Sequence, residues 1–417
     1  MTRRILLVAA LSLARALPAA ETRWNPVSPD SSPDPTVWRA SDGTWYATST
    51  SLKLLTSVDG VQWTETGRRI FSDAELKRIR RSHRMIWAPD VVDLGAGTNA
   101  AWRLYVSYVN SAHDSAIAAY RGESATGSFT FAGILTDAKA TGIKDTIDPE
   151  VVRDPETGKV WLFYGSTGRI HRLLLADDGL APAPGAKPVL VGGLSDEGVP
   201  NRLQVFEGSY LYRRAGWWYL FASRGWYKGH TYGIVVARSR SIEGPFSDRD
   251  GRPFEQGFAT VILSSGAKDR FFGPGHNGEI FTDADGRDWM YYHCHVKGRD
   301  AEKRPMFRQR LFWGKDGWPF FGNHGKPSPH AESAPRPVVP PNRPKNPLGS
   351  VVPTDRPKNP VGSVVPPNRP KNPLGSVVPT DRPKNPVESV VPTDRPKNPV
   401  GSVVPTDRPR AITEPPQ

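Results

Sequence analysis

Five residues that can exchange protons or bind a metal ion open five similar stretches of the sequence. Each is an acidic residue or a histidine before a short β-rich run, and a Trp-containing strand follows about ten to thirteen residues later, after a turn. In chain order they are Asp34, Asp90, Asp148, Glu207 and His276. Cleavage of a glycosidic bond needs one protonated and one ionised carboxyl group facing each other across a cleft. The pattern therefore indicates acid/base chemistry, provided that the fold brings these residues together.

The spacing of the five stretches predicts the fold that would do so. The opening residues are separated by 56, 58, 59 and 69 residues. Short strands and Asp-Gly turns at that period are typical of β-propeller blades, which bury their faces against each other in a ring. We expect an all-β, five-bladed β-propeller, in which the innermost strand of every blade starts near the axis. A β-sandwich or two β-domains is the alternative, but it explains the regular turn-to-Trp register less well.

Composition excludes several other classes of protein. The 417 residues are 37% apolar and 10% aromatic, which is enough for a hydrophobic core, and a lone Cys294 cannot form a disulfide within the chain. The net charge of +13 resides mostly at the two ends, since the last 87 residues alone carry 13 Lys and Arg against 7 Asp and Glu. The folded segment is close to neutral and has no nucleic-acid-binding motif, so we expect no sequence-specific nucleic-acid partner.

Residues 1–20 have the layout of a signal peptide. Arg3 and Arg4 precede an apolar run over residues 5–14, and small residues follow. The run is too short to span a bilayer, so we expect no transmembrane anchor and a secreted or periplasmic protein. An unprocessed N-terminal helix is the alternative.

The C-terminal segment, 331–417, repeats every 13 residues and holds 23 of the 42 prolines but none of the aromatic residues. Three prolines per repeat disfavour both helix and sheet, so we expect a disordered or polyproline-II-like tail behind a propeller domain over 21–330. Its basic repeats suggest adsorption to an anionic polymer as a further hypothesis. We expect the protein to be a monomer.

Five motifs together resemble glycoside hydrolase family 43, whose members are five-bladed, inverting enzymes that act on arabinan and xylan. They are Asp34-Pro35-Thr36-Val37, Trp87-Ala88-Pro89-Asp90-Val91, Ile147-Asp148-Pro149-Glu150-Val151, Glu207-Gly208-Ser209-Tyr210 and Gly273-Pro274-Gly275-His276-Asn277. The resemblance covers residues 25–322 and is strongest to the arabinanases. It implies an arabinan or arabinoxylan substrate.

The resemblance also implies roles for individual residues. Asp34 would be the general base that activates water, Glu207 the general acid, and Asp148 the residue that tunes the acid and holds the sugar. Substrate contacts would come from Trp87, Asp90 and Ser166. His276 would hold a calcium ion or another cation.

Two residues depart from the family pattern, and other functions stay open. Pro33 stands where arabinanases usually have His, and Ser209 stands where they usually have Pro. An exo-acting arabinofuranosidase or β-xylosidase, or a propeller that binds carbohydrate without cleaving it, remains an alternative.

Two further clusters have an ordinary structural explanation. His293-Cys294-His295 is best interpreted as part of a buried strand rather than as a metal site. The basic residues over 77–84 follow a capping box and indicate a solvated helix, with contact to an acidic polymer as the alternative.

Overall fold

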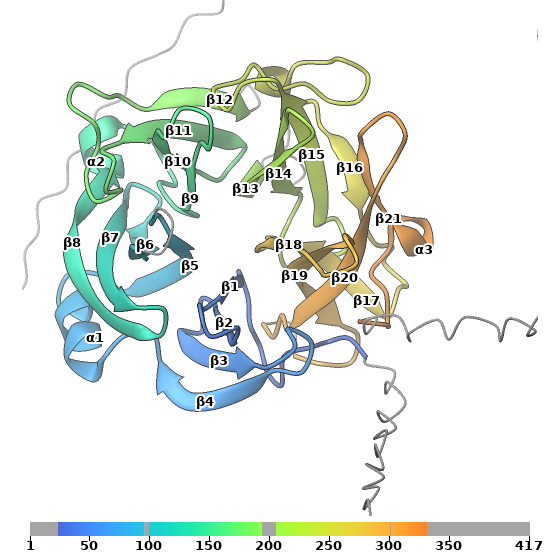
Figure 1. Cartoon of the computed structure of the whole chain (residues 1–417), viewed down its shortest axis with the longest axis horizontal. Helices are drawn as coiled ribbons and strands as arrows, with labels where there is room; N and C mark the ends of the chain where they lie inside the picture. Colours follow the sequence, from blue (N-terminus) through green and yellow to red (C-terminus); the bar gives the residue numbers. More distant parts are fainter. Residues whose placement is uncertain (1–23, 96–99, 194–205, 301, 332–417) are drawn as a thin grey trace, which may run out of the picture. The chain divides into compact units, whose positions relative to one another are not determined.

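The computed structural model describes residues 24–95, 100–193, 206–300 and 302–331. The predicted signal peptide (1–20) and all but the first residue of the predicted tail (331–417) lie outside these ranges. The described strands form five antiparallel sheets around a common axis (Figure 1). The prediction of a five-bladed β-propeller is confirmed.

Each blade has its strands in sequence order from the axis outward. The first two blades are β1 (Thr36–Arg39), β2 (Trp45–Thr48), β3 (Lys53–Ser57) and β4 (Thr64–Arg69), then β5 (Met85–Asp93), β6 (Trp102–Ser111), β7 (Asp114–Ser124) and β8 (Gly127–Asp137). The third and fourth are β9 (Glu150–Arg153), β10 (Val160–Tyr164), β11 (Arg169–Leu175) and β12 (Val189–Gly193), then β13 (Phe206–Arg214), β14 (Trp217–Arg224), β15 (Gly233–Ser239) and β16 (Thr260–Leu263).

The fifth blade differs because its innermost strand is divided. Both β17 (Phe271–Gly275) and β18 (Ile280–Thr282) pair with β19 (Asp288–Val296), which is followed by β20 (Met306–Trp313) and β21 (Pro319–Phe321). The described helices are short: α1 (Asp73–Arg80), α2 (Ala138–Thr141), the 3-10 helix η1 (Phe254–Gln256) and α3 (Gly322–Gly325). Within the described ranges, every helix is too short or too polar to span a bilayer.

Five hydrophobic clusters hold the ring together, one at each junction between neighbouring blades. The cluster between the third and fourth blades, for example, packs Trp161 and Phe163 against Leu220. The other four join the remaining pairs of blades in the same way. A blade therefore buries both faces only when its neighbours are present, which explains why the aromatic residues recur with the period of the blades.

The ring is closed by the first described residues, which join the last blade. Trp24 forms an isolated β-bridge with His330. The backbone N–H of Asn25 donates to the carbonyl of Pro329, and that of Val27 donates to Met306, both at 2.8 Å. These bonds connect segments about 300 residues apart and fasten the first blade to the fifth.

A second set of bonds runs around the axis. In every blade one side chain of the innermost strand, or in the fifth blade of the residue just before β18, accepts the backbone N–H of the next blade's innermost strand. In chain order the acceptors are Thr36 (3.2 Å), Asp90 (2.8 Å), Glu150 (3.5 Å), Tyr210 (3.0 Å) and Glu279 (2.7 Å). The donors are Val91, Val151, Leu211, Ile280 and Val37, so the set forms a closed ring, here called the inter-blade ring. It satisfies backbone groups that would otherwise be buried without a partner.

Candidate active site

Five equivalent backbone positions just before the inter-blade ring carry or adjoin the carboxyl groups and the histidine of the site. Each of these positions has a positive φ: Asp34 (54°), Ala88 (42°), Asp148 (58°), Gly208 (56°) and His276 (45°). Residues other than glycine rarely adopt this conformation, which costs on the order of 1 kcal/mol or more and persists only where surrounding structure imposes it. Strain of this kind is common at functional sites.

Side chains of the preceding blade impose it at four of the five positions. Thr50 Oγ1 accepts the backbone N–H of Ala88, and Ser107 Oγ accepts that of Asp148, both at 2.9 Å. Ser223 Oγ accepts from His276 at 2.5 Å, and His293 Nδ1 accepts from Asp34 at 3.1 Å. The second strand of one blade, or in the first blade the turn that follows it, thus orients the first residues of the next.

This register corrects the alignment inferred from the sequence. Asp34, Asp148 and His276 are equivalent, as expected, but the position equivalent to them in the second blade is Ala88 rather than Asp90. In the fourth blade it is Gly208, and Glu207 precedes it. A Cβ atom on Gly208 would lie 2.9 Å from the His276 ring, so glycine leaves room for that imidazole.

Asp34 lies among cationic and hydrogen-bonding groups. Its Oδ1 lies 3.1 Å from Arg304 Nη1 and 3.3 Å from His276 Nδ1, and its Oδ2 accepts a hydrogen bond from Thr50 Oγ1 at 2.6 Å. Burial by itself raises the pKa of Asp34, but Arg304, then His276 and His293, outweigh burial and hold that pKa well below its usual range. Asp34 is therefore ionised at neutral pH.

The pKa of Asp148 is shifted in the opposite direction to that of Asp34. It is buried, and burial, followed by the negative charges of Glu207 and Asp34, raises its pKa well above the usual range of an aspartate. His276 lies between the two aspartates, since its Nδ1 is 3.9 Å from Asp148 Oδ2. Burial also lowers the pKa of His276, so its imidazole is neutral at neutral pH.

Glu207 is half-buried and held by two hydroxyl donors. Ser166 Oγ donates to its Oε2 and Tyr232 OH donates to its Oε1, both at 2.7 Å. Tyr232 is itself fixed by packing, because its ring stacks on that of His293 with 5.7 Å between centroids and 6° between planes. The carboxyl group of Glu207 thus has a defined orientation beside Asp148.

The structure brings together five of the seven site residues named from the sequence: Asp34, Asp148, Glu207, His276 and Ser166, the last as a direct partner of Glu207. Trp87 is half-buried and stands next to Ala88, so it adjoins the site through Thr50. Asp90 is buried and belongs to the inter-blade ring, where its Oδ2 accepts from Val151.

Four residues of the site were missed from the sequence: Thr50, Tyr232, His293 and Arg304. His293 was interpreted only as part of a buried strand. It is fully buried in β19, but it also contacts both Asp34 and Arg304. Arg304 lies in the β19–β20 connection, with its guanidinium over the Tyr227 ring at 4.9 Å. Nothing in the sequence near these residues marks them. His293 and Arg304 come from the fifth blade and contact Asp34 of the first, whereas Thr50 and Tyr232 contact a carboxylate of their own blade across a stretch of 16 and 25 residues.

The residues around His276 offer few protein ligands to a cation. Its Nδ1 already faces two carboxylates, and in the part of the chain that the structure describes no group of three or more His, Cys, Asp or Glu side chains is arranged to hold a metal ion. A cation bound beside His276 would therefore depend on water for most of its ligands.

The arrangement provides the elements of acid/base chemistry in one small space. It contains an ionised carboxylate at Asp34, a carboxyl group at Asp148 whose pKa is raised well above its usual range, and a third, Glu207, oriented by two hydroxyl groups. Groups with different protonation states, side by side, are what acid/base cleavage of a glycosidic bond requires.

Comparison with known proteins agrees with this chemistry. The chain is 28% identical over 313 residues to an extracellular exo-α-(1→5)-L-arabinofuranosidase of Cellvibrio japonicus, covering 69% of this chain and 85% of that protein. It is 27% identical over 369 residues to an extracellular endo-α-(1→5)-L-arabinanase of Bacillus subtilis, covering 76% of each. The structure of a Cellvibrio cellulosa α-L-arabinanase complexed with arabinohexaose superposes with a TM-score of 0.59 at 26% identity, over 70% of this chain and 95% of that one.

Residues 24–319 match the glycosyl hydrolases of family 43. This stretch includes the strands β1 to β20 and every residue of the site described above. The chain belongs to glycosyl hydrolase family 43.

Proposed function

We propose that this glycosidase hydrolyses α-L-arabinofuranosidic linkages in arabinan or related polysaccharides, by an inverting mechanism with Asp34 as base and Glu207 as acid. The observation that carries the proposal is the contrast between Asp34, whose pKa Arg304 holds well below its usual range, and Asp148, whose pKa burial and the nearby Glu207 raise well above it. The arabinanase relatives support arabinan as the substrate.

In this mechanism Asp34 takes a proton from a water molecule as the water attacks the anomeric carbon. In its protonated form Glu207, oriented by Ser166 and Tyr232, gives its proton to the leaving oxygen as the glycosidic bond breaks. Asp148, beside Glu207, tunes the acid and can form a hydrogen bond with a sugar hydroxyl. The first product carries the inverted anomeric configuration, and Glu207 and Asp34 exchange a proton with solvent to restore the starting state.

The test uses substitutions that keep the shape of each side chain. Asp34→Asn and Glu207→Gln should each lower the release of reducing sugar from linear arabinan by about 10²-fold or more, the usual effect of losing a general acid or base. Asp42→Asn, in the exposed turn between β1 and β2, is the matched control and should retain activity. Full activity in either site variant, with folding verified by circular dichroism, would contradict the assignment.

Two further measurements separate the alternatives. NMR of the first product shows its anomeric configuration, and a retained anomer would exclude Asp34 as the base of an inverting reaction. The product sizes separate exo from endo action, since an exo enzyme releases one short product from the start. Binding of arabinan without any release of sugar would favour the carbohydrate-binding alternative.

Three sequence predictions stay predictions within this proposal. A calcium ion or other cation beside His276 would supply positive charge near the substrate, and chelation followed by metal analysis tests for it. We propose a secreted or periplasmic location, in keeping with relatives named extracellular. The monomeric state awaits measurement in solution.

A further inference from the structure

A groove of about 260 Å³ adjoins the catalytic carboxylates. It is lined by Thr50, Ser51, Leu52, Arg69, Leu76, Arg80, Arg84, Met85, Ile86 and Trp87. Thr50 connects it directly to the site, because the Thr50 hydroxyl donates to Asp34 Oδ2 and accepts from the backbone of Ala88, the residue after Trp87. A group bound in this groove would lie close to the sugar that contacts Asp34.

The charge of the groove is positive and uncompensated. Arg69, Arg80 and Arg84 line it, and no acidic side chain does. All three arginines are exposed, and none of them forms an ion pair with another residue in the described ranges. Nearby basic residues, by contrast, are paired with acidic ones: Lys53 forms an ion pair with Glu65 at 2.9 Å, and Arg78 forms one with Glu75 at 2.6 Å.

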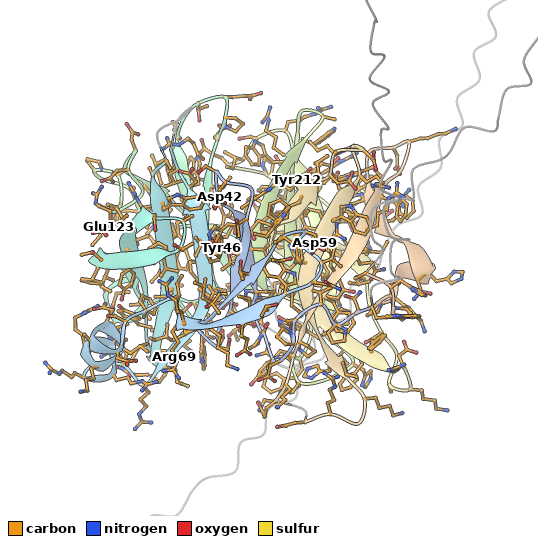
Figure 2. The ribbon with its side chains drawn as sticks, turned by 60° about the horizontal axis from the view of Figure 1, so that its bottom comes forward. Asp42, Tyr46, Asp59, Arg69, Glu123 and Tyr212 are labelled. Carbon is orange, nitrogen blue, oxygen red and sulfur yellow. The ribbon has the colours of Figure 1, made fainter. Side chains whose placement is uncertain are left out.

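The three arginines are presented by well-anchored segments. The N-cap residue Ser72 accepts the backbone N–H of Glu75, and the helix α1 that follows buries Leu76 and Ile79, which fixes the turn that carries Arg80. The backbone N–H of Arg84 donates to Asn110 Oδ1 at 2.8 Å. Figure 2 shows Arg69 at the end of β4 beside α1, away from the turn residues Asp42 and Asp59.

We propose that this groove binds the carboxylate of a uronic acid unit in the polysaccharide that the enzyme cleaves. Guanidinium groups match the geometry of a carboxylate through paired hydrogen bonds, and the apolar surfaces of Leu52, Met85 and Trp87 can contact a sugar ring. The groove is smaller than the sites of about 300–1,000 Å³ that enclose drug-sized ligands, which suits one sugar unit. The inference rests on the proposed function and specifies the substrate as an acidic, rather than purely neutral, polysaccharide.

The test measures binding without turnover. A full-length Glu207→Gln protein is titrated calorimetrically with trigalacturonate and with its carboxyl-reduced, neutral counterpart. We expect the acidic probe to bind about five- to tenfold more tightly at low salt, as partly exposed ion pairs with carboxylates allow, and the difference to shrink in 0.5 M NaCl.

Variants locate the binding. When Arg80→Gln and Arg84→Gln are both added to the Glu207→Gln protein, its preference for the acidic probe should disappear. Arg81→Gln, which removes the same charge from the end of α1 outside the groove, should keep it. The melting temperature of each variant shows whether the fold is intact, and Arg84→Gln alone serves as the second variant if the double substitution lowers it.

The outcomes either support or overturn the proposal. Equal affinity for both probes, or binding of neither, would overturn it. A loss of preference in Arg81→Gln as large as in the groove variants would also overturn it, because it would indicate attraction to the overall charge of the protein. The binding measurement needs no hydrolysis, so it can be separated from the proposed function. If the Glu207→Gln protein prefers the acidic probe but the wild type fails to cleave arabinan, only the proposed arabinan activity is refuted.

Discussion

Replacing Asp90 by Asn should change how the stability of the propeller depends on pH. Burial raises the pKa of Asp90 from 3.8 to about 7, against the opposing effect of its hydrogen bond from Val151. The folded protein therefore keeps a proton on Asp90 at pH values at which the unfolded chain has lost it. Stability from this group is fully present below about pH 4 and is lost as the pH rises toward 7.

The size of the effect follows from the same two values. Each pH unit between them costs about 1.4 kcal/mol of unfolding free energy, so Asp90 destabilises the folded state at pH 8 by on the order of 4 kcal/mol relative to pH 4. Asn is neutral at every pH and its Oδ1 can still accept the Val151 N–H. Its amide needs a new partner, for which the neighbouring carboxyl groups of Glu150 and Glu279 are available. We expect Asp90→Asn to exceed the wild type by about 2–4 kcal/mol at pH 8.

Urea unfolding followed by tryptophan fluorescence, at pH values from 4 to 8, measures this difference. The advantage of Asp90→Asn should grow with pH, whereas the exposed control Asp42→Asn should follow the wild type. A difference between Asp90→Asn and wild type that is independent of pH would refute the reasoning. Loss of activity in Asp90→Asn at a pH at which it is folded would instead restore the substrate-binding role predicted for Asp90 from the sequence.

Two other substitutions test how the catalytic carboxylates are held. Arg304→Gln removes the cation 3.1 Å from Asp34 Oδ1, so the pKa of Asp34 should rise. Two unit charges about 4 Å apart interact by about 4 kcal/mol at an effective dielectric constant of about 20. Water that enters the vacated space would offset part of this loss. The acidic limb of the pH profile of kcat/KM should therefore move up by about two pH units. Arg304→Lys should move it less, and an unchanged profile in Arg304→Gln would exclude this electrostatic role. Gly275→Ala would place a Cβ atom 2.1 Å from the ring of Tyr232, which donates to Glu207. We expect a loss of about 1–3 kcal/mol in stability and a lower kcat. Tyr232→Phe keeps the ring but removes the hydroxyl, so it should lower kcat with a smaller loss of stability. If Gly275→Ala, Tyr232→Phe and the wild type all had the same kcat, Tyr232 would not orient the acid.

The sequence alone determined the architecture and most of the residues that the candidate site brings together. The strands and Asp-Gly turns of one blade repeat locally, within about 60 residues, and a blade with two apolar faces must pack against others, so the period predicts a ring of five. Asp34, Asp148, Glu207 and His276 were found because they stand at or near the beginning of the short β-rich run that opens each repeat, and that position follows from the local pattern.

The tertiary structure decided the register and the partners of those residues. Each residue advances about 3.3 Å along a strand, so an offset of two residues moved Asp90 from the position of Ala88 into the inter-blade ring. Asp34 and Arg304 are separated by 270 positions, and their contact exists only because closing the ring places the fifth blade beside the first. Local patterns predict which elements form. Which charges meet, and therefore which carboxyl groups keep a proton, depends on distances between blades that only the folded structure defines.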